Sequence, residues 1–177
     1  YVVAFEGDPG EEARLAEAAA DGLRMFEQLF GYRSRTFIAP CYTWPASLEK
    51  TLRAEGVEAL QGMIHQCLPG GGHRRHWFGS RNALGQTYLL RNCFFEPTTD
   101  ACADPVDACM ERIACAFRWH KPAVISSHRV NYVGFIHPTN RDRSLRLLGE
   151  LLDRIRRRWP DVRFRTVSYT HLTLPTK

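Results

Sequence analysis

Short apolar runs that alternate with amphipathic, helix-like segments constrain the fold of this chain more than any other feature. The helix-like segments cover residues 11–30, 45–55, 105–119 and 140–159. The strand-like runs cover residues 35–40, 57–62, 86–95, 122–125 and 162–167. Alternation of this kind is typical of βαβ units, in which crossover helices join parallel strands. The sequence therefore predicts the α/β class, with a mainly parallel sheet or barrel.

Local signals fix several ends of these segments. Gly31 follows the first helix as a C-terminal cap, while Asp104 suits the N-cap and Pro105 the first position of a later helix. Residues 68–85 contain Pro-Gly-Gly-Gly and lack an apolar period, so we expect a long surface loop there. The strand over 86–95 is interrupted in its middle by Arg-Asn.

The composition is that of a globular protein, with 44% hydrophobic and 24% charged residues. No apolar run reaches transmembrane length, which argues against a membrane partner. The six cysteines form no Cys-x-x-Cys pair, and we expect reduced cysteines and a cytoplasmic location. The basic run over 154–158 ends a helix, where cations complement the helix dipole, so we expect no nucleic-acid partner.

The most informative candidate for chemistry is His128, which follows the apolar run Ala123–Ile125. That run has no polar alternation, as expected of a buried strand in a parallel sheet. The carboxyl ends of such strands are where ligands bind in α/β folds, and imidazole suits general acid or base catalysis. A hydrogen-bonded histidine at a strand end is the alternative. Asn131 and Tyr132 could orient a hydroxylated ligand, or serve the turn and the packing.

Two further strand ends carry candidate residues. Tyr42 and Trp44 follow the strand over 35–40 and could form a platform for a sugar ring, although Trp44 could equally pack under the next helix. Glu96 follows the strand over 86–95 and could be an acid, a base or a nucleophile. Arg91 and Asn92 could turn inward and hold that carboxylate, and an ordinary surface glutamate is the alternative.

The pair His73 and His76 lies in the glycine-rich loop, where a spacing of three proves little about metal binding. We favour a solvated loop there, and we assign no metal ligand in this sequence. Glutamines 61 and 66, near the strand over 57–62, are weaker polar candidates and are best explained by plain hydrogen bonding.

Two motifs resemble the polysaccharide-deacetylase superfamily of carbohydrate esterases. Phe37–Tyr42 is similar to that family's strand-end motif ending in Pro-Tyr or Pro-x-Tyr, and Val124–His128 is similar to its late strand. The resemblance implies a partial (β/α) barrel that acts on carbohydrate, with His128 protonating the leaving group. It also implies substrate-binding roles near the groove and the histidine loop for Tyr42, Trp44, Arg129, Asn131 and Tyr132. A divalent metal, expected to be zinc, would activate the attacking water.

The chain departs from the family pattern in ways that shape the expectation. The family's early Asp-Asp and His-x-x-x-His motifs are missing, and Ile38-Ala39 stands where an arginine usually precedes the proline. The chain begins at Tyr1 rather than Met, so we expect the metal ligands to precede it in a longer parent protein. Residues 168–177 are similar to translated sequencing adapter, and we expect one partial-barrel domain over 1–167 followed by this non-native tail.

Three functions remain open from the sequence. The first is a metal-dependent deacetylase whose catalytic histidine is His128, inactive as this chain alone. The second is a glycoside hydrolase that uses Glu96 and a second acid. The third is a non-catalytic relative that binds carbohydrate and has lost the chemistry.

Overall fold

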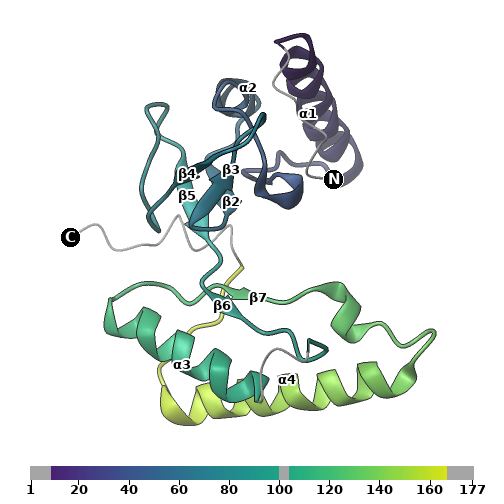
Figure 1. Cartoon of the computed structure of the whole chain (residues 1–177), viewed down its shortest axis with the longest axis vertical. Helices are drawn as coiled ribbons and strands as arrows, with labels where there is room; N and C mark the ends of the chain where they lie inside the picture. The colour runs from purple at the N-terminus through teal and green to yellow at the C-terminus, as the bar shows by residue number, and fades with distance from the viewer. Residues whose placement is uncertain (1–8, 100–103, 167–177) are drawn as a thin grey trace. The chain divides into compact units, whose positions relative to one another are not determined.

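A computed structural model describes residues 9–99 and 104–166 of the chain (Figure 1). These residues gather into two compact units. The first takes in the described residues up to Leu90 together with Thr166, and the second spans Arg91–Arg165.

The first unit is built on a parallel sheet of three strands in the order β1-β2-β5. These are β1 (Thr36–Ile38), β2 (Ala59–Gly62) and β5 (Thr87–Leu90). The central strand β2 has three buried residues of four, as expected of a strand that is covered on both faces. The α/β class predicted from the alternation is confirmed in this mixture of helices and parallel strands. The described strands form three separate small sheets rather than a closed barrel.

Two helices accompany this sheet, α1 (Pro9–Phe30) and α2 (Leu48–Ala54). The predicted helix over 11–30 is confirmed, and the Gly31 amide closes it by donating to the Glu27 carbonyl at 2.8 Å. Gly31 has a φ of 73°, a left-handed conformation that glycine adopts without strain. Leu52 is fully buried in the core beside Val57 and Leu60.

The expected long loop over 68–85 is wrong in its first part. It contains β4 (His73–Arg75), which pairs antiparallel with β3 (His65–Cys67). The turn between them holds Gly70, Gly71 and Gly72, all with positive φ. Both strands are short and polar, so they show no alternation of apolar and polar residues by which they could be recognised.

The interruption predicted at Arg91 and Asn92 is confirmed, and it separates two strands that belong to different units. The run over 86–95 divides into β5, which belongs to the first unit, and β6 (Cys93–Phe94), which belongs to the second. Strand β6 pairs in parallel with β7 (Ile125–Ser126). Strand β7 is shorter and begins later than the predicted strand over 122–125.

The second unit is completed by α3 (Pro105–Arg118) and α4 (Pro138–Arg158), which lie side by side in Figure 1. The Asp104 side chain caps α3 by accepting hydrogen bonds from the amides of Val106, at 2.8 Å, and Asp107, at 3.1 Å, as predicted. The helices bury an apolar core against β6 and β7; its members are Cys93, Phe95, Val106, Cys109, Met110, Ile113, Leu151 and Ile155.

The last predicted strand is wrong over its described part, because residues 162–166 form no strand. Phe164, the apolar side chain that a strand there would bury, is 56% exposed. Val167 and the expected non-native tail lie outside the described residues.

Candidate active site

The parallel pair β6–β7 sets two candidate residues opposite each other. Cys93 pairs with Ile125 and Phe94 with Ser126, so the two strands end in register. Glu96 lies two residues beyond the end of β6, and His128 lies two residues beyond the end of β7. Because the strands run in the same direction, both side chains arise at the same carboxyl edge.

Glu96 and His128 are joined there by hydrogen bonds. The Glu96 Oε1 atom lies 2.7 Å from His128 Nδ1, and the His128 backbone amide donates to the same oxygen at 3.1 Å. The His128 side chain is 67% exposed, whereas that of Glu96 is 23% exposed. The carboxylate therefore holds one ring nitrogen, and the rest of the imidazole stands in solvent.

Asn131 holds the other side of that carboxylate. Its Nδ2 donates to Glu96 Oε2 at 2.6 Å and to the His128 carbonyl at 2.9 Å. Its Oδ1 accepts from the Thr98 hydroxyl at 2.6 Å and from the Thr98 amide at 3.2 Å. The residue is fully buried in the one-turn 3-10 helix η2 (Arg129–Tyr132). All of these hydrogen bonds of the Asn131 amide are made within the protein. We therefore assign Asn131 to holding Glu96 and His128 in place rather than to contacting a ligand.

Thr98 is a residue of this network that the sequence analysis did not consider. Its position two residues after Glu96 was the only available signal, and a threonine beside Pro97 is typical of an ordinary loop.

The remaining residues of the loop that follows His128 lie nearer the surface. Tyr132 is half-buried, with its hydroxyl 2.7 Å from the Ser127 hydroxyl, and Arg129 is exposed.

Among the described residues, the Asn92 side chain bonds to backbone groups rather than to the Glu96 carboxylate. Asn92 brackets the start of the β6–β7 pair, because its Nδ2 donates to the Pro122 carbonyl at 2.9 Å and its Oδ1 accepts from the Val124 amide at 2.7 Å. The Arg91 guanidinium donates to the Ser126 hydroxyl at 3.3 Å. These contacts assign Asn92 to holding the strand pair.

Tyr42 and Trp44 belong to the first unit. Trp44 is only 3% exposed and packs in the core with Leu48 of α2, which is the packing alternative considered from the sequence. Its ring has no open face on which a sugar could stack. Tyr42 ends the short 3-10 helix η1 (Pro40–Tyr42), has a φ of 57° and is half-buried against the same core.

A buried polar network surrounds Trp44. The Glu49 carboxylate accepts from Trp44 Nε1 at 3.2 Å and from the Tyr88 hydroxyl at 2.8 Å. Burial, and then the hydrogen bond with Glu49, raises the pKa of Tyr88. The ring of His76 stacks on Tyr88 with centroids 3.7 Å apart. Burial lowers the pKa of His76, and the Arg74 guanidinium lowers it further.

Within residues 9–99 and 104–166, no group of three or more His, Cys, Asp or Glu side chains could hold a metal ion. In the same residues, no helix has the length and apolar character needed to cross a membrane.

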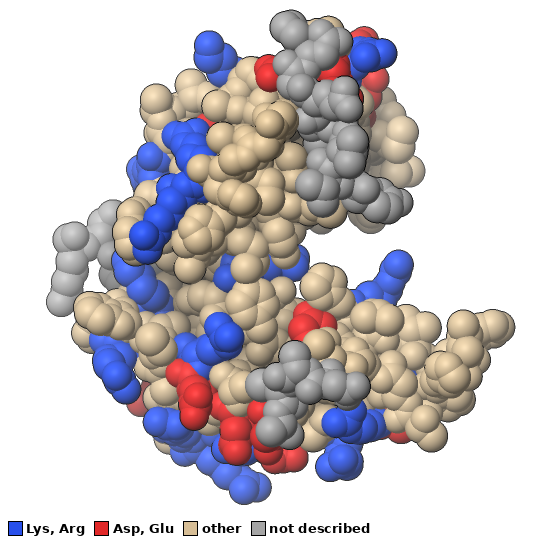
Figure 2. Space-filling view, viewed as in Figure 1, with Lys and Arg blue, Asp and Glu red and all other residues tan. Residues whose placement is uncertain are grey.

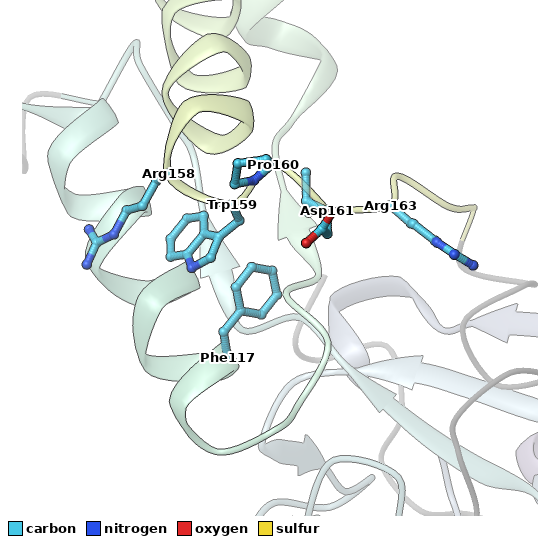
Figure 3. Close-up of a pocket in the computed structure, with 7 residues that line it drawn as sticks. Phe117, Arg158, Trp159, Pro160, Asp161 and Arg163 are labelled. Atoms are coloured by element: carbon cyan, nitrogen blue, oxygen red, sulfur yellow. The ribbon is translucent and has the colours of Figure 1, made fainter.

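A separate hollow of about 550 Å³ lies at the end of α4 (Figure 3). Trp159 and Phe117 form one wall with their rings edge to face, at 4.9 Å between centroids. Arg158 lies over the Trp159 ring at 4.9 Å, and Arg154 pairs with Asp107. Basic and acidic side chains are mixed on the face of this unit seen in Figure 2. None of the residues expected to carry chemistry lines this hollow.

Comparison with models of protein families, with curated proteins and with solved structures gives no match to this chain.

Proposed function

We propose that this chain carries the proton-transfer part of the active site of a carbohydrate hydrolase of the polysaccharide-deacetylase type. The observation that supports this most is the 2.7 Å contact between Glu96 Oε1 and His128 Nδ1 at the carboxyl edge of two parallel strands. An imidazole that is held through Nδ1 offers Nε2 to a ligand, and this arrangement serves acid–base catalysis in other enzymes.

The two residues divide the work. The Glu96 carboxylate accepts a hydrogen bond from Nδ1–H of His128, and this fixes the tautomer in which Nε2 carries the lone pair. When Nε2 takes up a proton, the same carboxylate stabilises the positive charge of the ring. The protonated His128 then delivers that proton from Nε2 to the departing amine or alkoxide of an acetylated sugar.

The contacts of Glu96 favour this supporting role over that of a glycosidase nucleophile or acid. Its Oε1 faces the His128 ring and amide, and its Oε2 faces Asn131. A nucleophilic or acidic carboxyl group needs an oxygen directed at the substrate, whereas both oxygens of Glu96 are directed at the protein.

The family resemblance also implies a zinc ion. The described residues do not fit one at this site, since no group of three donors is assembled among them, and we assign no step to the metal. We propose carbohydrate as the partner. Arg129, which is exposed and adjacent to His128 in the chain, is the best-placed residue of the loop to contact it.

The proposal can be tested with an activated acetyl ester, 4-nitrophenyl acetate. Its hydrolysis needs no metal-bound water and its nitrophenolate leaves without a proton, so the assay measures the first half of the proton transfer, in which His128 Nε2 takes a proton from the attacking water. We expect the purified chain to hydrolyse it, and His128→Ala to lower the rate by about 100-fold, the lower end of the usual acid–base contribution. Glu96→Gln should lower it by a smaller factor. His137→Ala is the matched control, because His137 is exposed at the start of α4 and has no side-chain capping bond. Equal rates in the His128 and His137 variants would contradict the proposal.

A second assay separates the deacetylase from its alternatives. With acetylated chitooligosaccharide and zinc, we expect no turnover by these 177 residues alone, and robust deacetylation would contradict that expectation. Release of reducing sugar that depends on Glu96 but not on His128 would favour the glycoside hydrolase. Binding of the oligosaccharide, followed by saturation-transfer NMR, without any His128-dependent ester hydrolysis would favour a non-catalytic protein.

A further inference from the structure

The β3–β4 hairpin of the first unit directs its side chains to two different faces. Gln66 of β3 is fully buried, and Arg74, which pairs with it, reaches within 3.9 Å of the buried Glu49. Side chains alternate along a strand, so the neighbours of these residues point the other way. We call this second side the outer face of the hairpin; it carries His65, Cys67, His73 and Arg75.

Two histidines meet on the outer face. The register pairs His65 with Arg75 and Cys67 with His73, which makes His65 and His73 diagonal neighbours. Their ring centroids are 6.0 Å apart, with the ring planes at 77°. Both residues are exposed, so the rings can turn toward solvent without disturbing the core.

This separation suits a shared metal ion. An imidazole nitrogen binds zinc and similar ions at 2.0–2.1 Å, so one ion can reach two rings whose centroids are up to roughly 6.5 Å apart. The observed 6.0 Å lies within that reach. The χ2 torsion of histidine is broad and shallow, so each exposed ring can turn one of its nitrogens toward an ion between the two rings.

The one charged residue on the outer face beside the two histidines is basic, and its position leaves the two rings accessible to a cation. Arg75 is the charged residue on the same face, and its guanidinium lies over the Trp77 ring, 4.3 Å from the centroid. This cation–π contact keeps the Arg75 guanidinium over the Trp77 indole. The backbone of β3 is fixed by the Trp44 amide, which donates to the Cys67 carbonyl at 3.3 Å.

We infer that His65 and His73 together bind one divalent first-row transition-metal ion, with water completing its coordination. Two imidazole nitrogens select ions such as Ni²⁺, Cu²⁺ and Zn²⁺ over Mg²⁺ and Ca²⁺, which prefer oxygen ligands. The hairpin holds both ligands on one rigid element, so the second bond forms at high effective concentration. This site is independent of the function proposed for His128.

The test uses Ni²⁺ and isothermal titration calorimetry at pH 8, in a Cys67→Ser background that removes the thiol opposite His73. We expect one site, and we expect His65→Asn and His73→Asn each to weaken it by about tenfold or more. Each single variant keeps one imidazole that still binds Ni²⁺ weakly, so the double variant should bind more weakly than either single variant and show no specific site. Binding should also weaken strongly at pH 5, where protons compete for the imidazoles.

His137→Asn is the matched control and should leave the affinity unchanged. Thermal melts of all variants should coincide, because both replaced histidines are exposed. Single variants that bind as well as their parent would overturn the inference, as would a specific site that persists in the double variant. A site present in the wild type but absent from the Cys67→Ser protein would also overturn it, since the thiol and not the histidine pair would then be essential.

Discussion

Glu96 Oε1 and His128 Nδ1 lie 2.7 Å apart although the two residues are separated by 32 positions in the chain. The contact follows from the parallel pairing of β6 with β7, since each residue lies two positions beyond its strand.

Glu96→Ala is expected to change the tautomer of His128. In the native protein the carboxylate favours the hydrogen on Nδ1, whereas free imidazole rings of histidine commonly carry it on Nε2. Long-range ¹⁵N–¹H NMR correlations of the imidazole at pH 8 measure this directly. The ring of His137 provides an internal reference that should not move. An unchanged His128 spectrum in the variant would mean that the contact does not form in solution.

Asn131→Ala is expected to lower the free energy of unfolding of the second unit by about 2–4 kcal/mol. The reason is that Glu96 Oε2 and the Thr98 hydroxyl both lose a partner inside the protein. Urea denaturation gives the value. Asn140→Ala is the control, because its amide donates one bond to the Val130 carbonyl near the surface, and it should cost less than about 1 kcal/mol. Equal losses would argue against the buried network.

Ser144→Ala is expected to stabilise the second unit by about 1 kcal/mol. Ser144 lies fully buried in α4, and its hydroxyl has no hydrogen-bond partner among the described residues. Ser126→Ala is a matched control, because Ser126 is also buried but its hydroxyl accepts from Arg91. Denaturation midpoints should therefore move in opposite directions. A Ser144 variant that is less stable than the parent would imply that this hydroxyl is satisfied in solution.

The cysteines should differ in their reaction with iodoacetamide at pH 8. Burial raises the pKa of the Cys93 thiol to about 12 and that of Cys109 to about 11, so little reactive thiolate is present at this pH. Cys41 and Cys115 are exposed. Peptide mass spectrometry should find the exposed pair labelled first, and the buried pair labelled only after urea is added. Early labelling of Cys93 would contradict the packing of the second core.

The stability of the first unit should depend on pH through His76. Its pKa in the folded state lies below the ordinary value of 6.5, so the unfolded chain binds more protons as the pH falls through that value. The stability that His76 supports is therefore present above pH 6.5 and decreases below it. Hydrogen-exchange mass spectrometry of peptides within 59–90 measures this between pH 7.5 and 5.0. His76→Gln should flatten the dependence, whereas the exposed His65→Gln should not; equal slopes in all three proteins would contradict it.

Helices were predictable from the sequence because their signals are local. The cap at Asp104 and the glycine at Gly31 were both read correctly. The β3–β4 hairpin was not, because its pairing depends on a turn of glycines between two polar strands that have no periodicity of their own.

The candidate site was predicted as separate residues rather than as an arrangement. Glu96 and His128 were both identified, but their pairing is a matter of strand register, which a single sequence does not reveal. The burial of Trp44 and Asn131 was equally hidden, because an aromatic or an amide after a strand suits both a ligand site and a core. Only the packing against α2 and the bonds to Thr98 distinguish the two.

Glu96 and His128 each lie two residues beyond the end of their strands, and this equal spacing limits how the two spacers can change in length. Side chains reverse direction with each residue of an extended chain, so one residue inserted or lost between Phe94 and Glu96 would turn the carboxylate away from the imidazole. The same holds between Ser126 and His128. A single-codon insertion or deletion in either spacer would separate the pair at once, and only a matching change in the other could restore it.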